Sequence, residues 1–361
     1  MRLRPRLIKE KTMATITRSS FGKLKDGREA SLFTMEAAGL KVCITDFGAH
    51  IVSIFAPDAS GVVADVLLGY DSVAGYEVDP SFFGATIGPS ANRICGAAFT
   101  IGDKKYQLAV NDGRNNLHSD GDLGFHKRLW KSEDTNGELK LSLSMKDGEM
   151  GFPGNMEVSV TFSITDDAGL KIHYYVTTDR PSLINMTNHA YFNLGGHDCG
   201  TILDHELKLK AGRYTPVVKG AIPTGELADV KGTVFDFTDF RRVGQNIDDD
   251  VEQLKLVKGY DHNWVIDNGE DGTLKNIATL KDPKSGRCMD VLTDQPGVQF
   301  YAGNCITPEP GKGGAHYDVR CGLCLETQVY PDSINQAGFP NCVYDADKPY
   351  DTVTIYRFYA G

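Results

Sequence analysis

Hydrophobic and polar residues alternate with a period of two along three neighbouring stretches of this chain, residues 139–145, 158–164 and 170–176. The last two are separated by the polar connector Asp-Asp-Ala-Gly, which ends in a glycine at 169. Such alternation buries one face of a strand and exposes the other, so it predicts antiparallel strands joined as a meander. Shorter apolar stretches predict further strands at residues 40–44, 51–55, 207–209 and 353–358.

Helical periodicity is rare by comparison. Ile247, Val251 and Leu254 follow the spacing i, i+4, i+7, which predicts one short helix. The 39 glycines and 15 prolines suit the many turns of a strand-rich chain. No repeat, low-complexity linker or change of composition marks a second domain. We therefore predict one large all-β domain over residues 14–361, built as an antiparallel β-sandwich with few short helices.

Residues 1–13 have a different character, with five basic side chains and little apolar continuity. They lack the apolar centre and the small-residue cleavage site of a secretory signal. An organelle transit peptide and an extension upstream of a natural start at Met13 are the alternatives. We expect a disordered tail in this region.

Charge and cysteine content narrow the class of protein. The chain has 38 Lys and Arg against 48 Asp and Glu, a net charge of −10, which argues against nucleic acid or an anionic membrane as partner. No apolar run approaches the length of a membrane span, so a soluble protein is expected. Eight scattered cysteines fit the reduced thiols of a cytoplasmic protein. Cys321-Gly-Leu-Cys324 lacks the second pair of a zinc ribbon and the βαβ context of a redox site.

The segment 185–196, Asn-Met-Thr-Asn-His-Ala-Tyr-Phe-Asn-Leu-Gly-Gly, concentrates hydrogen-bonding side chains around His189. Buried polar atoms need partners, which an ordinary core strand does not supply. Sugar hydroxyls pair with amides and imidazoles, and aromatic rings pack against the C–H groups of a sugar. The segment therefore indicates a carbohydrate site, and an exposed polar turn is the alternative.

Glu326 stands between apolar residues in a stretch that reads as a strand. Burial of its carboxylate is unfavourable unless the group is paired or used, and burial raises its pKa towards the range of a general base. A glutamate on an edge strand facing water is the alternative. The chain has no nucleophile elbow, phosphate loop or HExxH motif, and no two of its nine histidines have ligand spacing on one element. Acid–base chemistry without a metal is therefore expected.

Taken together, these polar clusters resemble the aldose 1-epimerases, also called galactose mutarotases. The resemblance extends over roughly residues 16 to 358, and two of its motifs, Thr-Asn-His-x-Tyr-Phe-Asn-Leu and Leu-Glu-Thr-Gln, are specific. The matching segments keep the family's order: residues 90–94, 115–118, 185–196, 259–263, 295–301 and 325–328.

The resemblance implies a β-sandwich enzyme that interconverts the α and β anomers of aldohexoses such as galactose and glucose without cofactor or metal. It also implies the roles of individual residues. Glu326 would take the proton of the C1 hydroxyl, and His189 would protonate the ring oxygen. The residues expected to hold the sugar are Asn92, Arg93, His118, Asp261 and Gln299, and His118 is a second candidate for assistance at the ring oxygen. A monomer or weak homodimer is expected.

Three positions depart from the family's pattern. This chain has Gly-Pro-Ser at 88–90, His-Ser-Asp at 118–120 and Gly-Phe-His at 124–126, where the family has Gly-Arg, His-Gly-Gly and Gly-Phe-Asp. Three other functions stay open on the sequence. They are a non-catalytic sugar-binding protein, a mutarotase acting on hexose 6-phosphates, and a glycosidase, for which Asp261 and Glu326 are the only carboxylate pair available.

Overall fold

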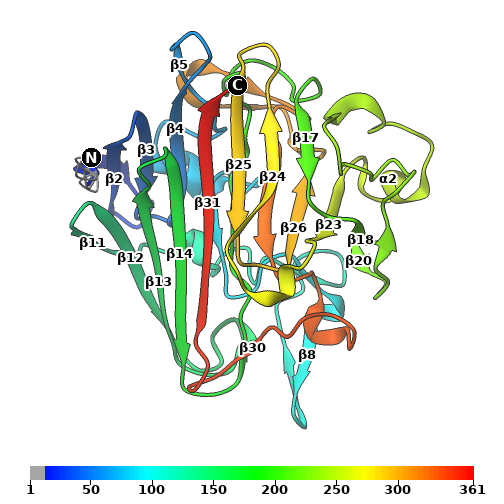
Figure 1. The fold of residues 1–361 in the computed structure, drawn as a ribbon. Coiled ribbons are helices and arrows are strands. Elements are labelled where there is room, and N and C mark those ends of the chain that lie inside the picture. Colours follow the sequence, from blue (N-terminus) through cyan, green and yellow to red (C-terminus); the bar gives the residue numbers. More distant parts are fainter. Residues whose placement is uncertain (1–12) are drawn as a thin grey trace, which may run out of the picture.

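Antiparallel strands dominate the computed structural model, which describes residues 13–361. They form one sheet of nine strands and two sheets of five, with several two-stranded ribbons around them (Figure 1). The two α-helices, α1 (Val73–Val78) and α2 (Glu252–Val257), are short. No helix in residues 13–361 is long and apolar enough to cross a membrane. The all-β prediction is confirmed, while the predicted tail lies outside the described residues except for Met13.

The nine-stranded sheet faces the viewer in Figure 1, with the C-terminal strand β31 (red) in its middle. β31 pairs with β14 on one side and with β25 on the other, so the chain end ties two halves of the sheet together. Its strands, in spatial order, are β11 (Lys131–Thr135), β12 (Glu138–Met145), β13 (Met156–Ile164), β14 (Gly169–Thr178), β31 (Tyr350–Ala360), β25 (Arg287–Thr293), β24 (Lys275–Lys281), β17 (Glu206–Leu209) and β22 (Arg241–Arg242).

Two five-stranded sheets pack behind it. The first is an N-terminal meander of β1 (Thr15–Lys23), β2 (Glu29–Ala37), β3 (Leu40–Thr45), β4 (Ile51–Pro57) and β5 (Val63–Asp65). The second has the order β21 (Ala228–Asp229), β18 (Arg213–Thr215), β23 (Asp261–Val265), β26 (Gly297–Tyr301) and β29 (Cys324–Gln328). One hydrophobic cluster joins the three sheets, with Ile44, Val160 and Phe300 among its fully buried members.

Short strands complete the chain. They are β6 (Ala85–Ile87), β7 (Arg93–Ile94), β8 (Ala98–Ile101), β9 (Lys104–Gln107), β10 (Asn116–Leu117), β15 (Ser182–Leu183), β16 (Thr187–His189), β19 (Val217–Val218), β20 (Ile222–Pro223), β27 (Glu309–Pro310), β28 (His316–Tyr317) and β30 (Val343–Tyr344).

The alternating pattern predicted the strands because it records burial directly. Along β13, Val158, Val160, Phe162 and Ile164 are buried and the residues between them are half-buried. The helix prediction was right in kind but wrong in extent. α2 begins at Glu252, and Ile247 is buried from the loop before it. Apolar spacing alone does not separate a helix from a loop that inserts one side chain into the core.

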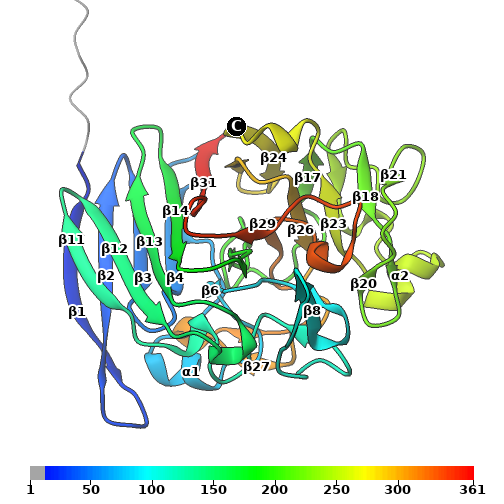
Figure 2. The same ribbon diagram turned by 90° about the horizontal axis from the view of Figure 1, so that it is seen from below.

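Strand β29 lies at the end of its sheet, yet all five of its residues are buried. Strand β16 packs against it, and β16 in turn pairs with β6. Figure 2 shows β29 and β6 near the middle of the molecule, between β12–β14 on one side and β18 and β23 on the other. The strands that carry Glu326 and His189 therefore meet in the interior.

Candidate active site

Six of the seven predicted site residues line one pocket. They come from segments separated by more than 200 positions, and the fold brings them together around β29 and β16. The complete wall is Pro80, Ser81, Phe82, Asn92, Arg93, Leu117, His118, His189, Tyr191, Asp261, Tyr301, Cys305 and Glu326.

Glu326 is the buried acid of this pocket. Only 2% of its surface is exposed, because β29 is covered on both faces, so the solvent-facing alternative does not apply. Its Oε1 atom lies 3.7 Å from Nε2 of His189, and its Oε2 atom has no hydrogen-bond partner among the described residues. Burial raises the carboxyl pKa well above its usual range, the charge of Asp261 adds to the effect, and Arg93 opposes it. A buried carboxylate whose charge is not fully compensated by hydrogen bonds or a cation takes up a proton readily.

His189 is surrounded by aromatic rings. Its ring centroid lies 5.0 Å from that of Tyr191, 5.9 Å from Phe82 and 6.2 Å from Tyr301. This apolar burial disfavours the imidazolium form and lowers the pKa of His189 to about 4. Its Nδ1 atom lies 3.4 Å from the sulfur of Cys324.

His118 is held in one tautomer by the backbone. The Asn92 N–H donates to its Nδ1 atom over 3.1 Å, so in the neutral ring the proton is on Nε2. Burial, followed by His189 and Arg93, lowers the pKa of His118 well below its usual value. The side chain is therefore a neutral hydrogen-bond donor on the pocket wall.

His118, His189 and Glu326 each place a possible metal-ligating atom within 4.8 Å of the others. Ligands of a tetrahedral zinc ion lie closer, at about 3.3 Å from one another for bonds of about 2.0 Å. A metal on Nε2 of His118 would also move the proton to Nδ1, against the Asn92 N–H. The cluster fits hydrogen bonding to a substrate better than it fits a metal.

Arg93 and Asp261 form the charged part of the wall. The Nε atom of Arg93 donates to Asp112 over 2.8 Å, and its Nη1 atom lies 4.0 Å from the Asp261 carboxylate. Gln299 donates to Oδ1 of Asp261 over 2.7 Å. Gln299 therefore lies next to Asp261 and is not among the residues that line the pocket, and its contact with the sugar stays a prediction. Asp112, which fixes the guanidinium, carried no signal in the sequence.

Sequence reasoning also missed three aromatic side chains of the wall. The hydroxyl of Tyr301 accepts the Cys305 N–H over 2.8 Å, which leaves its own proton for another acceptor. Tyr191 lies on the wall next to His189, with the two ring centroids 5.0 Å apart. Phe82 adopts a φ of 61°, unusual for a bulky residue, and packs its ring 4.9 Å from that of His118. Tyr191 belongs to the polar segment around His189, from which it could have been predicted. Phe82 lies in a loop that carries none of the motifs described above.

The three departures from the family's pattern lie one layer behind the wall. The hydroxyl of Ser119 accepts the Ser90 N–H over 2.8 Å and donates to the Ser90 carbonyl over 2.9 Å, so two of the departures contact each other. The third, His126, packs its ring 4.9 Å from that of Phe82. They shape the loops of the pocket and leave Glu326 and His189 in place.

Comparison with known proteins identifies the family. The family model described as aldose 1-epimerase matches residues 31–357. Bovine galactose mutarotase is 37% identical over 348 residues, which cover 96% of this chain and 99% of that protein. The chain belongs to the aldose 1-epimerase family. The aldose 1-epimerase of Escherichia coli K12 is likewise 37% identical, over 93% of this chain and 97% of its own length.

Solved structures agree with this family assignment. An aldose epimerase homologue from Caenorhabditis elegans superposes with a TM-score of 0.82 at 29% identity, over 90% of this chain and 96% of that one. A galactose 1-epimerase from Lactobacillus acidophilus, at 24% identity, has the same fold with a TM-score of 0.83 over 96% and 99% of the two chains. This aldose 1-epimerase is accordingly an isomerase.

Proposed function

We propose that this epimerase interconverts the α and β anomers of aldohexoses such as galactose and glucose, with Glu326 and His189 as its proton-transfer pair. The observation that carries the proposal is the 3.7 Å approach of a buried carboxylate to an imidazole at the wall of one pocket. Anomerisation needs a base and an acid at two oxygens of one hemiacetal carbon, and this pair supplies both.

The chemical step follows from those positions. Glu326 removes the proton of the C1 hydroxyl while His189, as imidazolium, gives a proton to the ring oxygen. The bond between C1 and the ring oxygen breaks, a C1 carbonyl forms, and the open chain rotates about C1–C2. Closure reverses both transfers: His189 takes the proton of the C5 hydroxyl and Glu326 returns one to the carbonyl oxygen.

The pair needs a single dissociable proton throughout. Ring opening starts with the proton on His189 and ends with it on Glu326, and closure moves it back. Burial disfavours the charged form of each group, since it raises the pKa of Glu326 and lowers that of His189. The two groups therefore titrate as a unit, and the state with one proton is the working state over a wide pH range.

The wall supplies the groups that hold the sugar. Asp261 accepts hydroxyl protons, Arg93 donates through a guanidinium fixed by Asp112, and His118 donates from Nε2. Gln299 orients Asp261 through its hydrogen bond and is the further candidate for contact with the sugar.

The charge of the pocket favours a neutral sugar over a hexose 6-phosphate. Among the described lining residues Arg93 is the one basic side chain of fixed charge, and Asp112 and Asp261 already engage it. A phosphate would instead meet the carboxylates of Asp261 and Glu326. One Glu326 oxygen is buried without a partner among the described residues, which is unfavourable in free energy. A protein that only binds sugar would have no catalytic use for this carboxylate, so the observation favours an enzyme.

The wider setting belongs to the same proposal. We infer a single catalytic domain over residues 14–361, acting as a monomer or weak homodimer in the cytoplasm. All eight cysteines are free thiols and five of them are buried, which suits a reducing compartment.

Polarimetry tests the function directly. Freshly dissolved α-galactose and α-glucose should reach anomeric equilibrium far faster with the enzyme than without it, and glucose 6-phosphate should be accelerated much less. Equal acceleration of the phosphate would exclude the neutral-sugar assignment. The matched control is Glu326→Gln, which keeps the shape of the side chain and removes the base.

A further inference from the structure

One strand supplies a partner to each ring nitrogen of His189. Cys324 and Glu326 are two residues apart on β29, so their side chains project from the same face of the strand. The sulfur of Cys324 lies 3.4 Å from Nδ1, and the Oε1 atom of Glu326 lies 3.7 Å from Nε2. The imidazole is thus placed between a thiol and a carboxylate that the strand holds in fixed register.

Cys324 is completely buried and is not part of the pocket wall. Burial raises its pKa well above the usual value, and the carboxylates of Glu326 and Asp261 add to the effect. The raised pKa favours the neutral thiol over the thiolate, so the group is not suited to act as a nucleophile. A thiol is a weak donor through S–H and a weak acceptor through sulfur. When His189 gives its Nε2 proton to the sugar, the neutral ring keeps a proton on Nδ1, so the sulfur can accept from Nδ1–H in both charge states of the ring.

His118 provides the contrast within the same pocket. Its Nδ1 atom faces the backbone N–H of Asn92, which can only donate. Protonation of His118 at Nδ1 would place two donors against each other, so this ring is confined to its neutral form. The partner at Nδ1 is what distinguishes the two histidines: a group that can only donate at His118 and one that can accept at His189.

We propose that Cys324 is a positioning residue for catalysis: it directs Nε2 of His189 towards the sugar and Glu326, and it keeps a hydrogen bond to Nδ1 in both charge states of the ring. This role of Cys324 depends on the proposed role of His189 as the acid. The thiol is the group that lets His189, and not His118, gain and lose a proton in each turnover.

Three variants test the inference in the full-length chain. Cys324→Ala removes the partner of Nδ1 and should lower kcat about tenfold or more with little change in KM, since the sugar does not contact this residue. Cys324→Ser restores a group that donates and accepts, and it should recover kcat to within a few-fold of the wild type. Cys321→Ala, at the other cysteine of the CxxC pair, is the matched control and should leave kcat unchanged, because Cys321 accepts an N–H from Asp318 and makes no contact with His189.

The acid limb of the kcat–pH profile separates positioning from packing. A serine oxygen accepts Nδ1–H better than sulfur does, so Cys324→Ser should move the acid limb to higher pH. Cys324→Ala should move it to lower pH, because the imidazolium loses its acceptor. Packing damage alone would lower activity without moving the limb.

Two results would overturn the inference. One is a folded Cys324→Ala enzyme with wild-type kcat and an unmoved acid limb. The other is a Cys324→Ser enzyme as impaired as Cys324→Ala, which would make the role one of shape. If Cys324→Ala does not fold, the acid limb of the kcat–pH profile of Cys324→Ser tests the inference: a limb at the wild-type pH would reject it. His189→Asn tests the proposed function independently of the thiol. Full activity in this variant would reject the role of His189 as the acid. Lost activity in His189→Asn together with normal activity in Cys324→Ala would reject only the role of the thiol.

Discussion

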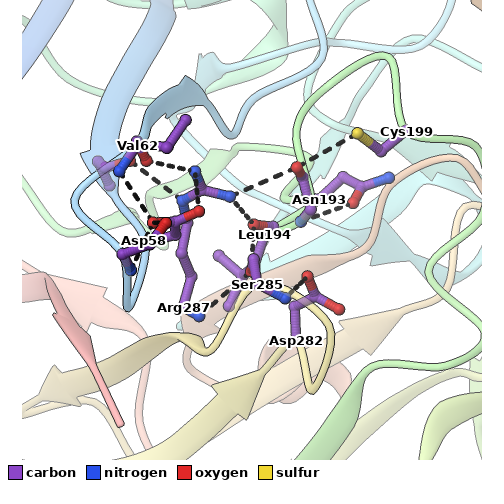
Figure 3. Close-up of polar contacts among 11 residues, drawn as sticks. Asp58, Val62, Asn193, Leu194, Cys199, Asp282, Ser285 and Arg287 are labelled. Carbon is purple, nitrogen blue, oxygen red and sulfur yellow. Dashed lines mark hydrogen bonds and ion pairs between the residues drawn. The ribbon is translucent and has the colours of Figure 1, made fainter.

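Two buried ionisable side chains in this molecule, Arg287 and Glu326, differ in how many hydrogen-bond partners surround them. Arg287, on β25, is 3% exposed, and each nitrogen of its guanidinium donates to a backbone carbonyl (Figure 3). It donates to the carbonyls of Ala56, Leu194 and Val62 over 3.1, 3.0 and 2.8 Å. Glu326 is 2% exposed, yet one of its oxygens has no partner among the described residues.

The difference distinguishes structure from function. Arg287 joins the loop after Phe192 to the β4–β5 hairpin, and Asp58 at 3.8 Å balances its charge. All three nitrogens of the guanidinium donate to backbone carbonyls, so the group rigidifies the fold. Glu326 retains unused hydrogen-bonding capacity at the pocket wall, and the rest of the sandwich offsets this unfavourable burial. Removing each charge should therefore have opposite effects.

The largest effect is expected on the rate. Glu326→Gln should lower kcat for galactose by about 10²–10⁴-fold, the usual contribution of one positioned proton-transfer group, because the amide cannot accept a proton. Its thermal stability should be equal to or higher than that of the wild type, since an unpaired buried acid is removed. Polarimetry and a melting curve on the same sample measure both. A variant with near-normal kcat would reject the mechanism.

Arg287→Met should show the reverse pattern. Loss of this guanidinium leaves the buried carbonyls of Ala56 and Leu194 without their donor, which is expected to lower the free energy of unfolding by about 1–3 kcal/mol for each unsatisfied group. The folded fraction should keep its kcat, because no group of the pocket is touched. Arg242→Met is the control: its ion pair with Asp204, at 3.7 Å, is exposed to solvent, so its loss should leave the free energy of unfolding almost unchanged. Denaturant titration measures the free energy of unfolding of both variants. Equal losses in Arg287→Met and Arg242→Met would show that the buried guanidinium has no special structural role.

Asp261→Ala is expected to act mainly on KM. The carboxylate binds hydroxyls that differ little between substrate and transition state, and a hydrogen bond to a charged group contributes about 1.5–3 kcal/mol, so KM should rise about tenfold or more. Gln299→Ala should give a smaller rise, because the Asp261 carboxylate that Gln299 orients stays in place. A loss confined to kcat would assign Asp261 to the chemical step.

The pH profile of kcat should be broad around neutrality. Activity should fall in acid as the pair gains a second proton, near the lowered His189 pKa of about 4, and fall in alkali as it loses its last one, above the usual glutamate range because burial raises the Glu326 pKa. The alkaline limb should be absent from the residual activity of Glu326→Gln. An acid limb near pH 6.5 would indicate an unburied histidine.

The smallest effect is expected from metal removal. Extensive dialysis against a chelator should leave kcat unchanged, because the proton transfers need only a carboxylate and an imidazole. A matched sample treated with zinc-saturated chelator controls for the additive. Strong inhibition that one divalent ion reverses would show that His118, His189 and Glu326 hold a metal after all.

The sequence by itself determined the strands, because side-chain alternation is a local property that burial imposes on each segment: Val158 and Val160 indicate their face of β13 without reference to any other strand. It also indicated Glu326, since a charge within an apolar strand is unfavourable unless it has a use. Only the tertiary structure decided how these residues are partnered. Contacts between distant segments placed Gln299 next to Asp261, set Cys324 against His189 and brought Phe82 to the wall. A side chain's partner depends on which strand packs against its own, and no local pattern records that.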